Sequence, residues 1–122
     1  MTFQISKDFS FSASHILDGL PEGHQCGRLH GHNYLIRLEL SSDHLDSHGF
    51  IYDYGDLKPF GAWLDDNLDH RHLNDQLDFQ PTAENMAHFL AKLAVELLDL
   101  DPSISVSCSV SETPKSWARW VP

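Results

Sequence analysis

Three histidines lie at positions from which they could bind one metal ion. His30 and His32 flank Gly31, and residues two apart in a strand share a face, with their side chains about 7 Å apart at the base. This spacing alone is a weak signal, because such histidines are more often surface or core residues. His15 adds a third imidazole at the apolar end of another alternating segment. Three imidazoles would leave the fourth position of a tetrahedral zinc ion open, as catalytic zinc requires.

Cys26 precedes His30 by four residues in a glycine-flanked segment, which would bring its sulfur near such a metal ion. Two roles are open for this residue. As a fourth ligand it would close the site and make it structural, whereas as a thiolate beside an open site it would act as a base or nucleophile. Cys108 alternates with apolar residues and is expected to be a small core residue.

Two carboxylates complete the candidate site. Asp69 precedes His70 in a polar segment, and a carboxylate can orient an imidazole and raise its basicity, although such pairs are also common in exposed loops. Glu112 continues the apolar face of the last predicted strand, where a carboxylate is costly unless it meets a cationic or N–H-rich partner. The guanidine-like edge of a ligand would supply that partner.

Alternation of apolar and polar side chains predicts the strands that carry these residues. Residues 3–15 and 30–41 predict two long antiparallel strands, and residues 17–28 between them form a loop rich in Gly and Pro. Residues 103–111 predict a last strand, and residues 50–53 a short returning one. The tail from Thr113 to Pro122 is too short to define an element.

Helical spacing predicts two helices between these strands. The first covers residues 54–68 after Asp53 as N-cap, and the second opens at Pro81-Thr82 and ends at Asp101-Pro102. This order predicts an α+β fold with both helices on the apolar face of an antiparallel sheet. Open sheet edges would then be closed by pairing between subunits.

The length of 122 residues predicts a single domain over 1–122. The net charge of −10 makes nucleic acid and anionic membranes poor partners. No apolar stretch predicts a membrane span or a secretory signal, and two cysteines in different surroundings favour a reducing, cytoplasmic location. Nine histidines, against eight Lys and Arg together, strengthen the prediction of a metal or proton-transfer site.

Several ordered motifs resemble one known family, the 6-pyruvoyl-tetrahydropterin and 6-carboxy-tetrahydropterin synthases. The resemblance spans almost the whole chain. The motifs are FSASH at 11–15, CGRLHGHNY at 26–34, DYGDLK at 53–58, LDH at 68–70, LN at 73–74, PTAEN at 81–85 and SET at 111–113.

The resemblance implies the tunnelling fold, in which a four-stranded antiparallel sheet carries two helices on one face. Sheets of several subunits then join into a barrel, and paired trimers form a homohexamer. It also implies a role for each site residue: His15, His30 and His32 bind zinc, Cys26 is the catalytic base, Asp69 and His70 are its proton relay, Glu112 binds the amino-pyrimidine ring of a pterin, and Thr82 assists it.

Three residues separate Cys26 from His30, a spacing that resembles the bacterial 6-carboxy branch, whereas pyruvoyl enzymes usually have a longer insertion. The implied reaction converts 7,8-dihydroneopterin triphosphate to 6-carboxy-5,6,7,8-tetrahydropterin, acetaldehyde and triphosphate, towards 7-deazaguanine compounds such as queuosine. Two alternatives stay open: a 6-pyruvoyl synthase, which leaves the carbon chain intact, and a non-catalytic structural zinc module closed by Cys26. Arg71-His72 and the Trp117 and Trp120 tail depart from the pattern at the substrate rim.

Overall fold

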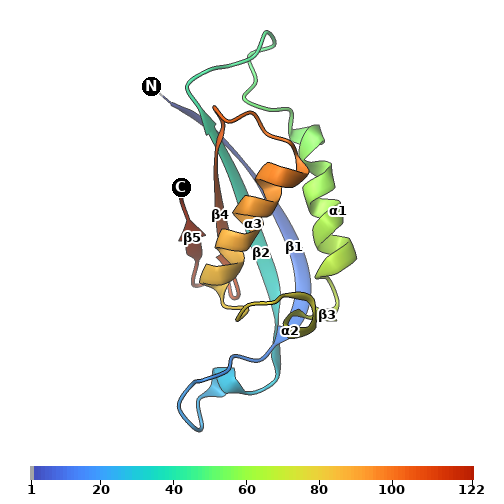
Figure 1. The fold of residues 1–122 in the computed structure, drawn as a ribbon, viewed down its shortest axis with the longest axis vertical. Helices are drawn as coiled ribbons and strands as arrows, with labels where there is room; N and C mark the ends of the chain where they lie inside the picture. Colours follow the sequence, from blue (N-terminus) through green and yellow to red (C-terminus); the bar gives the residue numbers. More distant parts are fainter. Residues whose placement is uncertain (1) are drawn as a thin grey trace.

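The computed structural model describes residues 2–122 and is built on two long paired strands (Figure 1). β1 (Phe3–His15) and β2 (His30–Ser42) are antiparallel throughout, from the pair Phe3 and Ser42 to the pair His15 and His30. The alternation predicts both strands, and the structure confirms them. The loop that joins them contains one 3-10 turn, η1 (Gln25–Gly27).

The sheet has five strands in the order β3-β1-β2-β4-β5, so the prediction of four antiparallel strands is wrong. β4 (Ser105–Ser111) is the predicted last strand and pairs antiparallel with β2. β3 (Arg71–His72) pairs parallel with β1, and β5 (Ala118–Trp120) pairs antiparallel with β4. Strands of two or three residues are too short to show alternation, so periodicity cannot reveal them.

Residues 50–53 do not form the short returning strand that their composition predicts. Asp46 Oδ1 accepts the N–H groups of His48 and Phe50 at 2.8 and 2.9 Å. A turn closed by an aspartate side chain in this way takes backbone donors that a strand would use for pairing. The segment is therefore a turn that leads into the first helix.

The helix predicted over residues 54–68 consists of a 3-10 turn, η2 (Tyr54–Leu57), and α1 (Lys58–Asn67). Asp53 is the N-cap of the 3-10 turn, and its side chain accepts a backbone N–H at 2.8 Å. Pro59 lies at the start of α1, where its missing N–H costs little. The cap is confirmed, and the proline marks where the α-helix proper begins.

The second predicted helix is α3 (Ala83–Leu97), which ends before the expected Asp101-Pro102. Thr82 is its N-cap, and the Thr82 hydroxyl accepts the Asn85 N–H at 3.1 Å. One further turn, α2 (Leu73–Gln76), lies between the two predicted helices. Figure 1 shows α1 and α3 on the same face of the sheet, so the predicted two-layer arrangement is confirmed.

The core lies between the sheet and these helices, and its last rows are histidines. Pairing places Ala13 opposite His32 and His15 opposite His30, on the face that carries the apolar side chains. The most deeply buried residues of that core include Tyr34, Ile36, Leu38, Leu40, Phe60, Leu64, Met86 and Leu90. The apolar face of β1 and β2 therefore ends in imidazoles.

The C-terminal tail is attached to the rest of the molecule through β5. Arg119 Nε donates to Glu39 Oε1 of β2 at 2.9 Å. The Lys92 ammonium of α3 lies 4.7 Å from the centre of the Trp120 ring, a distance at which cation and ring attract. Trp120 thus holds an edge strand against a helix. Within residues 2–122, no helix combines the length and apolar character needed to cross a membrane.

Candidate functional site

His15, His30 and His32 converge as predicted, because strand pairing sets them side by side on one face. Their ring centres are 4.5, 5.1 and 4.9 Å apart, and one ring nitrogen from each lies within 4.8 Å of the others. Within residues 2–122, they form the single cluster of His, Cys, Asp and Glu side chains with this geometry. Three convergent imidazoles are a donor set that suits zinc.

Backbone carbonyls fix the orientation of two of these rings. His15 Nδ1 lies 2.8 Å from the carbonyl oxygen of Pro81, and His30 Nδ1 lies 2.7 Å from that of Arg28. Because a carbonyl only accepts, both Nδ1 atoms donate. When these rings are neutral, each Nε2 lone pair is therefore available to a metal ion.

Burial also favours the neutral form that binds metals. Desolvation lowers the pKa of His15 below its ordinary value, against the opposing influence of the Pro81 carbonyl and Glu112. Desolvation likewise lowers the pKa of His32, although the charge of Glu112 opposes it. At pH 7 both imidazoles are therefore neutral, the state in which histidine coordinates a metal.

Glu112 lies against the histidines. Its Oε2 atom is 3.3 Å from His15 Nε2 and 3.4 Å from His32 Nε2. Glu112 also lines a hollow of about 210 Å³ with Ala83 and Trp117. Thr82 caps α3 immediately before this hollow, so the two predicted pterin-binding residues lie at neighbouring places in the fold.

Asp69 and His70 form the predicted pair. Asp69 Oδ2 lies 2.9 Å from His70 Nδ1, and Asp69 Oδ1 accepts the Ser12 N–H at 2.9 Å. These interactions, the Ser12 hydrogen bond first, lower the pKa of Asp69, so the carboxylate is charged near neutral pH. The His70 side chain is 83% exposed, which leaves its ring free to exchange protons with a bound molecule.

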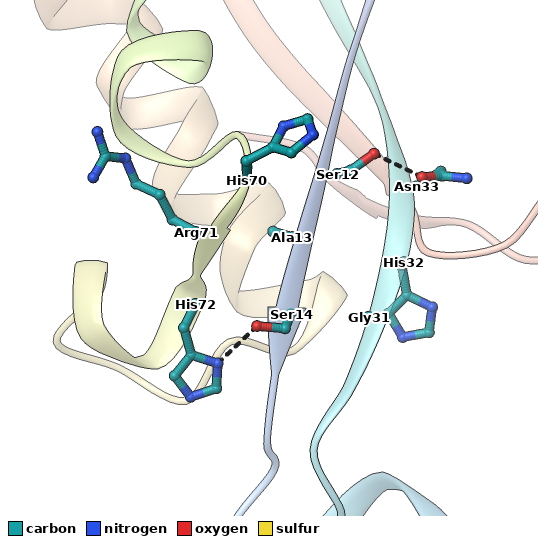
Figure 2. A pocket seen from close by; sticks show the side chains of 9 residues that line it. All are labelled: Ser12, Ala13, Ser14, Gly31, His32, Asn33, His70, Arg71 and His72. Carbon is teal, nitrogen blue, oxygen red and sulfur yellow. Dashed lines mark hydrogen bonds between the residues drawn. The ribbon is translucent and has the colours of Figure 1, made fainter.

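His70 lines an open hollow of about 480 Å³ whose other walls come from β1, β2 and β3 (Figure 2). His72 lies in the same hollow, with its Nδ1 3.0 Å from the Ser14 hydroxyl. Figure 2 shows His70 and His32 flanking β1, and both residues line this hollow. The sequence offers no signal for His72, since its partner is 58 residues away and the strand that brings them together is very short.

Cys26 lies in η1 and is half-buried. Its backbone N–H donates to His24 Nδ1 at 3.1 Å, and its carbonyl accepts the Leu17 N–H at 3.0 Å. The sulfur does not belong to the histidine cluster. Cys108 is buried as expected, and burial raises the pKa of its thiol to about 12, which leaves it unreactive.

Comparisons with known proteins agree with this arrangement. The family model described as 6-pyruvoyl tetrahydropterin synthase matches residues 4–121. A 6-carboxy-5,6,7,8-tetrahydropterin synthase of Bacillus subtilis is 31% identical, over 99% of this chain and 86% of its own. Its namesake in Synechocystis is 41% identical, over 73% of each chain.

A solved structure supports the fold independently. The 6-pyruvoyl tetrahydropterin synthase of Caenorhabditis elegans superposes with a TM-score of 0.85 at 24% identity, covering 100% of this chain and 96% of that one. The match in fold extends over the strands and helices that place the histidines and the Asp69–His70 pair. Together with the family match over nearly all residues, this shows that the chain belongs to the 6-pyruvoyl tetrahydropterin synthase family.

Proposed function

We propose that this tetrahydropterin synthase is a zinc-dependent lyase of the 6-carboxy type. It would convert 7,8-dihydroneopterin triphosphate to 6-carboxy-5,6,7,8-tetrahydropterin with release of acetaldehyde and triphosphate, a step towards 7-deazaguanine compounds such as queuosine. The observation that carries the proposal is the convergence of His15, His30 and His32, with the Nε2 atoms of His15 and His30 left free by their carbonyl partners.

Two observations favour this reaction over the 6-pyruvoyl one. Only three residues separate Cys26 from His30, and the relatives from Bacillus subtilis and Synechocystis carry the 6-carboxy name. The structural zinc module is less well supported, because the sulfur of Cys26 lies outside the cluster that would have to include it. Such a module would also leave the Asp69–His70 pair without a use.

A bound zinc ion would acidify the hydroxyls of the substrate side chain and polarise a neighbouring carbonyl. Cys26 would remove a carbon-bound proton from that side chain, and His70, oriented by Asp69 at 2.9 Å, would move hydroxyl protons. Glu112 and Thr82 would hold the pterin ring from the hollow beside the metal centre. The contribution of the protein itself is to hold these proton acceptors at fixed positions, with Cys26 acting as its thiolate.

The assembly and location are part of the same proposal. We infer a homohexamer in which sheets of neighbouring subunits join, since the polar sheet face and the short edge strands would otherwise face solvent. Both cysteines are free, as expected in a reducing cytoplasm.

The deciding experiment is incubation of the zinc-loaded protein with 7,8-dihydroneopterin triphosphate, followed by mass analysis of the pterin and an assay for acetaldehyde. The 6-carboxy reaction gives one acetaldehyde for each pterin formed. A 6-pyruvoyl synthase would release triphosphate without acetaldehyde, and a structural zinc module would leave the substrate unchanged.

A further inference from the structure

We propose that Glu112 is a fourth protein ligand of the metal ion while no substrate is bound, and that a pterin releases it from the metal. The inference rests on the zinc site and pterin substrate of the proposed function. The new element is an exchange of partners: the Glu112 carboxylate binds the metal ion in the resting enzyme and binds the pterin in the substrate complex.

Distances around Glu112 fit a fourth metal ligand. Zinc holds imidazole nitrogens and carboxylate oxygens at about 2.0 to 2.2 Å, so two ligand atoms of a tetrahedral site lie about 3.3 to 3.5 Å apart. Glu112 Oε2 is 3.3 Å from His15 Nε2 and 3.4 Å from His32 Nε2. Two edges of a tetrahedron that includes Glu112 are therefore already present.

The third edge, from Glu112 to His30, requires the Glu112 side chain to move. The ligand atoms that all lie within 4.8 Å of one another come from the three histidines alone. Glu112 would complete the tetrahedron by rotation about its own side-chain bonds. Its side chain is 29% exposed, so this rotation displaces no packed core.

The atoms that face one another in the cluster are hydrogen-bond acceptors. With Nδ1 of His15 donating to Pro81, a neutral His15 ring presents an Nε2 lone pair to the Glu112 carboxylate. It also presents that lone pair to His30 Nε2, 2.9 Å away, whose own Nδ1 donates to a carbonyl. Acceptors that face one another at these distances need a cation between them.

Glu112 also belongs to two sites at once. Beyond the histidines it lines the hollow of about 210 Å³ beside Ala83 and Trp117. A planar ring with an amino-pyrimidine edge in that hollow would offer two N–H donors to the carboxylate. Binding there would draw Glu112 away from the metal and free one position for the substrate hydroxyls.

Cobalt-substituted protein tests this inference, because the visible absorption of Co²⁺ reports on its ligands and requires no turnover. We expect Glu112→Gln and Glu112→Ala to change the cobalt spectrum and to weaken Co²⁺ binding about tenfold or more, since even partners one shell further out contribute about 10- to 100-fold. Glu84→Gln is the matched control, because Glu84 lines the same hollow without contact with the histidines. Its spectrum and affinity should equal those of the wild type.

Unsubstituted pterin, which lacks the side chain that could chelate the metal, provides the second measurement. Adding it to the wild-type cobalt protein should shift the spectrum towards that of Glu112→Ala. This titration decides the question even if both Glu112 variants misfold.

Identical resting spectra and affinities in folded wild-type and Glu112 variants would overturn the inference, as would an unchanged wild-type spectrum in saturating pterin. The proposed function would survive both results. Failure of the wild-type protein to bind any cobalt or zinc would instead remove the metal site, and the proposed function with it.

Discussion

At the residue scale, the candidate site depends on protonation states that the surroundings set. The carbonyls of Pro81 and Arg28 hold the Nδ1 atoms of His15 and His30, and desolvation lowers the pKa of His15 and His32. The alternation of the strands could predict which histidines meet. It could not predict their tautomers, because the carbonyl of Pro81 comes from a segment 66 residues from His15.

Glu112 also shows what the sequence pattern could not predict. Its place on an apolar face predicts a cationic partner, and the expected partner is a ligand. The structure places two histidines of the cluster beside it, at 3.3 and 3.4 Å. Periodicity gives the face of a side chain but not the direction in which a long, flexible carboxylate turns at the end of a strand.

The role of Cys26 leads to a prediction at this scale. Cys26→Ala should retain bound zinc and a folded structure, because the sulfur lies outside the histidine cluster. Turnover should fall by about two to four orders of magnitude, the usual consequence of losing a general base. Zinc content by atomic absorption and acetaldehyde release measure the two effects separately. Loss of zinc with activity would instead support a structural ligand, and full activity would remove any catalytic role.

At the scale of elements, the long strands and helices could be predicted, and the short connections could not. Thirteen-residue β1 and β2 repeat the alternating pattern often enough to define their faces. β3 exists because Ser12 accepts the His70 N–H through its carbonyl and donates its own N–H to Asp69. Such a strand is made by tertiary contacts, and no local pattern in two residues could reveal it.

This attachment of β3 predicts a measurable pH dependence. The hydrogen bond from Ser12, together with His70, lowers the pKa of Asp69 below the 3.8 of a free side chain. The ionised Asp69 carboxylate should therefore contribute fully to the free energy of unfolding above about pH 4. This contribution should disappear as the pH falls through the lowered pKa. The Ser12 amide chemical shift, followed by NMR, should titrate with a midpoint below 3.8. Asp69→Asn should abolish this transition, and a midpoint at or above the free value would show that the hydrogen bond does not form in solution.

At the scale of the whole molecule, the proposed catalytic groups are spread over separate places. Figure 1 shows η1, which carries Cys26, at one end of the molecule, whereas β3 follows His70 beside α2. His70 is 83% exposed and lines an open hollow that His32 also lines. Cys26 does not line this hollow, and we expect a neighbouring subunit to bring Cys26 and His70 together in the proposed hexamer.

Mixed hexamers of two inactive variants test this arrangement. Cys26→Ala and His70→Ala should each be inactive alone, since each lacks one proton-transfer group. If Cys26 of one subunit acts with His70 of the next, equal mixing by dissociation and reassembly leaves about a quarter of the sites complete and restores about that share of activity. Reassembled wild-type protein sets the reference rate, and native mass spectrometry verifies that subunits have exchanged. Exchanged hexamers without activity would show that both groups must come from the same chain.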